Sequence, residues 1–153
     1  MNQVVVKQEK SGYQIVEAYK SLRTNLQFCG EDKKVIAVTS CTPNEGKSSV
    51  SMQLGISLAE SGKRVILIDA DLRKSVLLGR TKTQKSVRGL AHFLSGQATL
   101  EDVICSTNVK NFYMIYSGPF PPNPAELLGG KNFRSLLNAL RKVYDYVIVD
   151  TPP

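Results

Sequence analysis

Apolar residues along the chain follow two spacings, and each predicts a different kind of element. From Tyr13 to Phe28 they recur at steps of three and four residues, which predicts an amphipathic helix. Residues 35–39 form a continuous apolar run, as expected of a central parallel strand buried on both faces, and residues 64–69 predict a second such strand. The remaining predictions are strands at 112–116 and 144–150, helices at 47–60, 90–94, 100–104 and 132–142, and a brief helix after the proline-rich loop that begins at 117.

The order of these elements predicts the fold class. Strand, helix, strand, helices, strand, helix and strand follow one another, which is typical of an α/β fold with right-handed crossovers between parallel strands. We therefore expect a three-layer α/β/α domain of the P-loop NTPase type with a mainly parallel sheet. Residues 1–12 are polar apart from Val4 to Val6 and lack periodicity, so we expect a flexible N-terminal arm before a domain at 13–153.

Size and cysteine content limit the class of protein. A chain of 153 residues, 42% of them hydrophobic, suits one globular domain. No signal peptide is recognisable and no apolar run approaches the roughly 20 residues that span a bilayer, so we expect a cytoplasmic protein. The three cysteines, Cys29, Cys41 and Cys105, lack metal-ligand or redox spacing and are predicted to be reduced thiols.

The net charge of +7 favours an acidic partner, such as a nucleotide, a nucleic acid, an anionic membrane face or an acidic protein segment. Charge alone does not choose among them. Much of the excess lies in residues 73–88, which contain basic side chains and no acidic one. This segment is either a solvated loop, extended by repulsion, or a loop that closes over phosphates or docks an acidic substrate.

A phosphate-binding loop is predicted between the strand at 35–39 and the helix at 47–60. Residues 40–49 read SCTPNEGKSS, and backbone N–H groups of such a turn converge with those of the helix N-terminus on phosphate oxygens. Gly46 lets the backbone approach closely, Lys47 neutralises the outer phosphates, and Ser48 is positioned to bind Mg²⁺. Cys41 stands where the usual GxxxxGK[ST] pattern has its first glycine. The predicted ATP-binding residues are Thr42, Pro43, Asn44, Glu45, Gly46, Lys47, Ser48 and Ser49.

Two further strand ends carry carboxylates. The run VILIDADLR brings Asp69 and Asp71 to the same side of an extended chain, with Arg73 two residues further on. The run YVIVDTPP ends in Asp150, in the manner of a Walker B aspartate that can hold Mg²⁺. Either site alone has an ordinary explanation, because Asp is common where strands end. Beside a phosphate loop, we expect all three elements to converge on one crevice.

Together these motifs resemble the bacterial tyrosine kinases that control capsule and exopolysaccharide synthesis. Four features appear in the family's order, from about residue 13 to the end: the SxxPxEGKSS loop, the DxDLR strand end, the GPxPPNPAELL loop at 118–128, and the VDTPP ending. The related partitioning and division-site ATPases have the loop KGGxGK[ST] with a signature lysine. Thr42 occupies the place of that lysine here, which favours a kinase.

The resemblance implies an ATP-dependent protein-tyrosine autokinase that regulates polysaccharide synthesis or export. Mg²⁺ would be bound through Ser48 with Asp69 or Asp150, and Asp71 would accept the proton of the tyrosine hydroxyl. A separate membrane activator would recruit the chain to the inner face of the cell membrane, and no nucleic acid is expected as a partner. The implied catalytic residues are Lys47, Asp69, Asp71 and Arg73.

The family also carries an ExxRxxR helix that packs subunits into a ring. Here EAYKSLR supplies Glu17 and Arg23, with Lys20 at the middle position, so self-association into a ring is implied with a lysine that lacks arginine's bidentate fork. Without the family, these residues would be read as an exposed helix face with charge pairs three residues apart.

The resemblance further implies additional strands and a tyrosine-rich tail after Asp150, so we expect a sheet that is incomplete at its C-terminal side. None of the six tyrosines forms such a cluster. Two other functions therefore stay open. One is a nucleotide-binding regulatory fragment without kinase activity, and the other is a partitioning-type ATPase that uses nucleotide to switch dimerisation.

Overall fold

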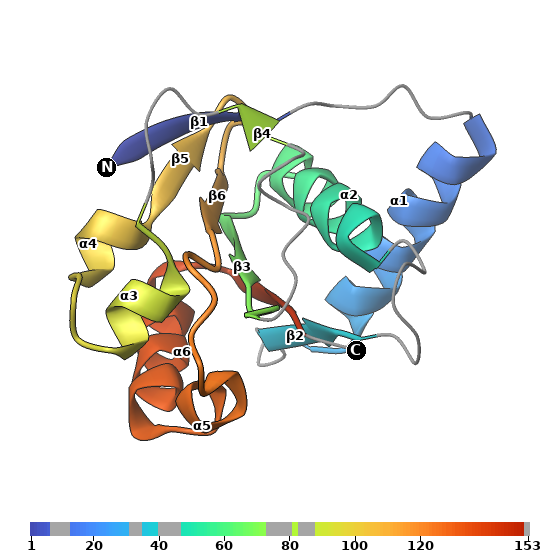
Figure 1. The fold of residues 1–153 in the computed structure, drawn as a ribbon. Helices are drawn as coiled ribbons and strands as arrows, with labels where there is room; N and C mark the ends of the chain where they lie inside the picture. Colours follow the sequence, from blue (N-terminus) through green and yellow to red (C-terminus); the bar gives the residue numbers. More distant parts are fainter. Residues whose placement is uncertain (7–12, 31–34, 40–46, 73–80, 83–87, 152–153) are drawn as a thin grey trace.

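The computed structural model describes residues 1–6, 13–30, 35–39, 47–72, 81–82 and 88–151, without the side chains of 13–15, 47–48 and 81–82. Figure 1 shows the arrangement of the elements. The strands are β1 (Asn2–Val6), β2 (Val35–Val38), β3 (Val65–Asp69), β4 (Thr81–Lys82), β5 (Cys105–Thr107), β6 (Phe112–Ile115) and β7 (Tyr146–Asp150). The helices are α1 (Tyr13–Phe28), α2 (Lys47–Glu60), α3 (Leu90–Leu94), α4 (Leu100–Val103), α5 (Pro124–Leu128) and α6 (Lys131–Val143). Within these residues, no helix is both long and apolar enough to cross a membrane.

The described strands form one sheet in the order β2-β7-β3-β6-β5-β1-β4. Strands β2, β7, β3 and β6 each run parallel to the next. Antiparallel pairing appears toward the other edge, between β5 and β6 and between β1 and β4, while β1 is parallel to β5. The expected α/β fold with a mainly parallel sheet is confirmed.

Helices cover both faces of this sheet (Figure 1), because successive residues of a buried strand point to opposite sides. Val65 and Leu67 of β3 belong to the apolar core beneath α2, together with Phe112 of β6. Ile66 and Ile68 belong to the core on the other face, with side chains from α3 and α6. The three layers predicted from the sequence are therefore present, with α2 over the first core.

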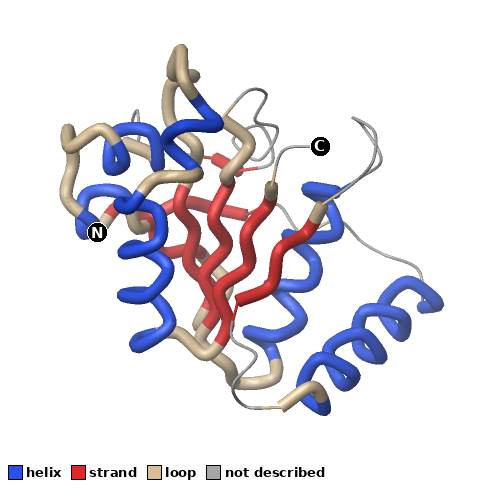
Figure 2. The backbone as a smooth tube through the Cα atoms, turned by 90° about the horizontal axis from the view of Figure 1, so that it is seen from below, coloured by secondary structure: helices blue, strands red, loops and turns tan. Residues whose placement is uncertain are grey.

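Helix α1 lies outside α2, on the side away from the sheet (Figure 2). Its Leu26 packs against the core beneath α2, whereas Val16, Leu22 and Phe28 are exposed, Phe28 to 85%. The sequence predicted α1, from its periodicity, and α2 at the positions that the structure has. Gly62 follows α2 with φ 93°, a left-handed conformation that suits glycine and ends the helix.

The prediction of a flexible arm at residues 1–12 is wrong for residues 2–6. These residues form β1, which pairs with β5 through Asn2 and Cys105 and with β4 through Val5 and Lys82. Val4 and Val6 are buried, to 3% and 2% exposure. Residues 7–12 lie outside the described residues. The error arose because a three-residue apolar run has no periodicity, and its partner strand lies about a hundred residues further along the chain.

The prediction that β2 is a central strand buried on both faces is also wrong for the described part of the chain. There β2 is the terminal strand of the sheet, paired to β7 only, and Val35 is 38% exposed. Ile36 and Val38 pack against the core on the α2 side. A continuous apolar run predicts a strand, but it does not determine how many strands lie beside it.

Two of the three cysteines lie in the described residues, and both are free thiols, as predicted. Cys29 is exposed and Cys105 of β5 is fully buried. Burial raises the pKa of the Cys105 thiol to about 11. This thiol is therefore protonated and unreactive at neutral pH. Cys41 lies outside the described residues.

Candidate functional site

Three strand ends meet at one edge of the sheet. Strands β2, β7 and β3 are adjacent and parallel, so their carboxyl ends lie together, which is where open α/β sheets bind ligands. Asp69 and Asp150 are direct partners in the register of β3 and β7, and Val38 of β2 is the partner of Asp150 on its other side. The predicted convergence of the two aspartate-bearing strand ends is confirmed.

Helix α2 begins at Lys47, directly after the segment predicted to bind phosphate. It packs on β3 and β7, the two strands that end in Asp69 and Asp150. The positive end of its dipole therefore belongs to the same region as the carboxylates. Several predicted site features lie outside the described residues: Thr42, Pro43, Asn44, Glu45, Gly46, Arg73 and the side chains of Lys47 and Ser48. Ser49 is described and half-buried.

The carboxylates at this edge are buried. Asp69 and Asp150 are each 1% exposed, and Asp71 is 9% exposed. The backbone N–H of Asp71 donates to Asp69 Oδ1 at 3.2 Å, and the N–H of Ala70 donates to the carbonyl oxygen of Asp150 at 3.0 Å. Thr151 is bound to the carbonyl oxygen of Val38 through its N–H, at 3.1 Å, and its hydroxyl, at 3.0 Å. Hydrogen bonds thus link the backbone around the carboxylates across the ends of β2, β7 and β3.

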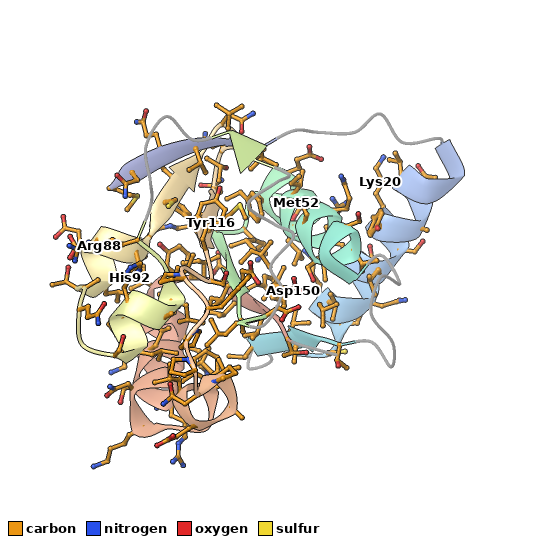
Figure 3. All side chains as sticks on the ribbon, in the orientation of Figure 1. Lys20, Met52, Arg88, His92, Tyr116 and Asp150 are labelled. Atoms are coloured by element: carbon orange, nitrogen blue, oxygen red, sulfur yellow. The ribbon has the colours of Figure 1, made fainter. Side chains whose placement is uncertain are left out.

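Ser51 contributes a contact that was missed in the sequence. Its hydroxyl donates to Asp150 Oδ1 at 3.3 Å, and its side chain is fully buried. Figure 3 shows Asp150 between the sheet and α2, the helix that carries Ser51. The available signal was spacing, because Ser51 follows Ser48 by three residues and so lies on the same face of the helix. A polar residue one turn after a predicted metal ligand was a reasonable candidate for contacting the same site.

The residues predicted to mediate ring assembly make contacts within the chain. Glu17 and Lys20 form an exposed ion pair at 3.6 Å. Arg23 donates from Nη1 to the carbonyl oxygen of Ser57 at 3.1 Å and to the Ser57 hydroxyl at 3.5 Å. Ser57 lies in the last turn of α2, which has no basic residue of its own, so Arg23 supplies a cation to the negative end of that helix. Arg23 therefore joins α1 to α2.

A proline-rich loop follows β6, the neighbour of β3, at the same edge of the sheet. It begins at Gly118, which has φ 77°, and leads into α5 with Pro124 in the first turn, as predicted. Gly118 lies against Gly89, where an added Cβ would come within 2.3 Å of the Gly118 nitrogen. His92 Nδ1 accepts the N–H of Gly89 at 3.0 Å (His92 is labelled in Figure 3). The start of this loop is thus anchored to the start of α3.

A family model described as an AAA domain matches residues 33–153. Tyrosine-protein kinase CpsD of Streptococcus agalactiae is 44% identical to this chain over 137 residues, which make up 90% of this chain and 60% of CpsD. The chain therefore spans about three fifths of the length of that curated relative.

Two solved structures are similar to different degrees. The kinase domain of the Escherichia coli tyrosine kinase ETK matches with a TM-score of 0.84 and 40% identity, covering 90% of this chain and 55% of that one. The septum site-determining protein MinD of Pyrococcus horikoshii OT3, complexed with Mg-ADP, matches with a TM-score of 0.64 and 28% identity, covering 78% of this chain and 49% of that one. The tyrosine kinase domain is the more similar of the two by every one of these measures.

Proposed function

Because the chain belongs to the AAA domain family and to the bacterial tyrosine kinases of the capsule and exopolysaccharide type, we propose that it transfers the γ-phosphoryl group of ATP to protein tyrosines. The observation that carries the proposal is the pairing of Asp69 with Asp150 at the carboxyl ends of adjacent strands, against the helix that begins at Lys47. Phosphoryl transfer depends on positioning and charge stabilisation, which this arrangement provides.

ATP is proposed to bind with its phosphates at the N-terminus of α2. The loop residues Thr42 to Gly46 would donate backbone N–H groups, and Lys47 would neutralise the outer phosphates. Ser48 and Ser49 would add hydroxyl groups at the first turn of the helix. The likeness to MinD complexed with Mg-ADP supports the binding of a nucleotide with Mg²⁺.

The oxygen ligands at this edge fit Mg²⁺. Asp69 and Asp150 are buried carboxylates on neighbouring strands, and Ser48 is the second residue of the helix beside them. Two carboxylates suit Mg²⁺, which binds one or two carboxylates and completes its shell with phosphate oxygens and water. Bound there, the ion would neutralise charge on the transferring phosphoryl group.

Asp71 is proposed to accept the proton of the substrate tyrosine. Its N–H is bound to Asp69 Oδ1, so its backbone is held beside the proposed metal ligand. A carboxylate is a weak base for a phenol with a pKa of about 10, so proton transfer follows phosphoryl transfer rather than driving it. Arg73, two residues further on, would add positive charge near the phosphates.

The tyrosine substrates are proposed to come from other segments or other proteins. Tyr116, Tyr144 and Tyr146 are buried, to 2%, 4% and 8% exposure. These phenols therefore pack in the core, and this burial raises the pKa of Tyr144 and of Tyr146. A membrane activator, recruitment to the inner membrane face and ring assembly through α1 belong to the same proposal and rest on the family.

A single assay tests the proposed activity. The purified chain is incubated with Mg²⁺, γ-labelled ATP and a peptide that carries several tyrosines, and phosphotyrosine is measured together with nucleotide binding. We expect labelled peptide from the wild type and loss of label in Lys47→Met. Lys110→Met is a matched control, because Lys110 is exposed and lies at the start of β6, at the opposite edge of the sheet.

Each outcome of the assay identifies one function. Equal phosphotyrosine from Lys47→Met and wild type would refute the role of Lys47. Nucleotide binding without transfer would favour the regulatory fragment. ATP hydrolysis without phosphotyrosine would favour the partitioning-type ATPase.

A further inference from the structure

We propose that Ser51 is a positioning residue that orients the carboxylate of Asp150 toward the Mg²⁺ of a bound nucleotide. The proposal rests on the nucleotide and metal site of the proposed function and extends it to a residue outside the predicted phosphate loop. Its basis is a direct contact between two buried side chains, since Ser51 is 0% and Asp150 1% exposed and their oxygens are 3.3 Å apart.

The backbone of Asp150 is held before Ser51 acts. Its strand pairs with β2 on one side and β3 on the other, and its carbonyl oxygen accepts the N–H of Ala70. The direction of its carboxylate depends in addition on rotation about the side-chain bonds. The Ser51 hydroxyl donates to Oδ1 of that carboxylate and so favours one rotation.

The position of Ser51 on α2 relates its contact with Asp150 to the proposed Mg²⁺ site. Ser51 follows Ser48 by three residues, so the two positions lie on one face of the same helix. Ser48 is a proposed direct ligand of Mg²⁺, and Asp150 is the proposed ligand from the sheet. The Ser51 contact fixes the carboxylate of Asp150 relative to α2, the helix that provides the other proposed ligand. A metal site of defined geometry requires its ligands to be held in fixed relative positions.

The distance sets the expected size of the effect. At 3.3 Å the contact is longer than the roughly 2.7 Å of a typical O–H···O bond. Losing a group that orients a metal ligand weakens metal binding by about 10-fold to 100-fold. Because this contact is long, we expect the lower end of that range.

The test separates metal binding from folding and from catalysis. The dissociation constant of a fluorescent ADP analogue is measured in excess Mg²⁺ and in EDTA, for the wild type, Ser51→Ala, Ser51→Thr and Ser57→Ala. Ser57→Ala removes the same hydroxyl from the same helix at another buried position, one that contacts Arg23 instead of Asp150. Thermal melting of each variant in EDTA reports the fold.

We expect Ser51→Ala to weaken binding about 10-fold in Mg²⁺ and to leave it unchanged in EDTA. Ser57→Ala should match the wild type in both conditions, and Ser51→Thr should recover the Mg²⁺ dependence by keeping the hydroxyl. Titration with Mn²⁺, followed by its paramagnetic signal, should show the same loss in Ser51→Ala when the nucleotide is saturating.

Two results would overturn the proposal: an unchanged Mg²⁺ dependence in Ser51→Ala, or an equal loss of affinity in EDTA. If the added methyl group in Ser51→Thr disturbs the core, the comparison of Ser51→Ala with Ser57→Ala still tests the proposal. Failure of the kinase activity is distinguishable, because it leaves Mg²⁺-dependent nucleotide binding intact while phosphotyrosine is absent.

Discussion

The two halves of the sheet differ in what they bury. In the half formed by β2, β7 and β3, the strands are parallel and their ends carry Asp69, Asp71 and Asp150. These are the buried carboxylates of the described residues. In the half formed by β6, β5, β1 and β4, antiparallel pairs appear and the polar side chains bind backbone groups, as Asn108 does with Val6.

This difference indicates which half of the sheet contains the functional residues. Buried carboxylates oppose folding, because the charged form loses its hydration and needs compensating partners. In this fold the three buried carboxylates lie together at one edge of the sheet, so their unfavourable effect on stability is confined to that edge. The other half instead uses its polar groups to complete hydrogen bonds, which adds stability. We therefore expect changes in the first half to affect nucleotide chemistry and changes in the second half to affect stability.

The largest expected effect is in the carboxylate half. Asp69→Asn removes the charge and keeps the oxygen that accepts the N–H of Asp71. We expect phosphotyrosine formation to fall by about 10²-fold to 10³-fold, because charge stabilisation in the transition state is lost. The rate of peptide labelling measures this, with thermal melting as the check on the fold. A full rate in Asp69→Asn would remove this residue from the catalytic site.

The next effect is in the other half and concerns Cys105. Val6→Asp puts a carboxylate into an apolar position and should detach β1, which covers Cys105. The thiol pKa would then fall from about 11 toward its ordinary value near 8.5, so the thiolate fraction at pH 8 rises by roughly 10²-fold. Mass spectrometry of iodoacetamide-treated protein measures the labelling of Cys105, and exposed Cys29 is the internal control.

The direction of this change follows from the protonation states. A raised pKa keeps the thiol protonated below about pH 11, so the native chain resists alkylation at pH 8. Unchanged protection in Val6→Asp would mean that β1 does not shield this thiol. The nucleotide affinity of Val6→Asp should match that of the wild type, because the substitution lies in the half of the sheet without the carboxylates. This measurement compares the two halves directly.

The smallest expected effect is at Asn108. Its Oδ1 accepts the N–H of Val6 at 2.7 Å, and its amide donates to the carbonyl oxygen of Val6 at 3.4 Å. Asn108→Ala should lower the free energy of unfolding by about 1–2 kcal/mol, because two backbone groups at the end of β1 lose their partner. Urea denaturation measures this change. Kinase activity below the denaturation midpoint should be unaffected, and a selective loss of activity would contradict the division between the halves.

How well the sequence predicts an element of this structure depends on how far apart in the sequence the interacting residues lie. Helices α1 and α2 lie where they were predicted, because the signals that predict a helix, such as the periodicity of α1, are local properties of the chain. The aspartate-bearing strand ends were also predictable, since parallel strands joined by helices bring their carboxyl ends together. Strands β1 and β5 were missed because each is short and stabilised by the other, and no local pattern records that pairing.

Within the candidate site, residue types were predictable and contacts were not. The roles assigned to Lys47, Ser48, Asp71 and Arg73 stay predictions. Arg23 was interpreted as an assembly residue, and the structure adds a bond to Ser57 within the chain. The contact of Ser51 with Asp150 joins a helix to a strand 99 residues away, and only the fold brings these two side chains together.

The pairing of β1 has a consequence for how the chain folds during its synthesis. Strand β1 is synthesised before β5, and Val6 is 102 residues from its hydrogen-bond partner Asn108 in the sequence. At about 5–20 residues per second, the partner follows roughly 5–20 s later. Until then β1 cannot pair with β5, and the chain must close a loop of about a hundred residues before that pairing forms. The pairing of β1 with β5 is therefore a late step of folding.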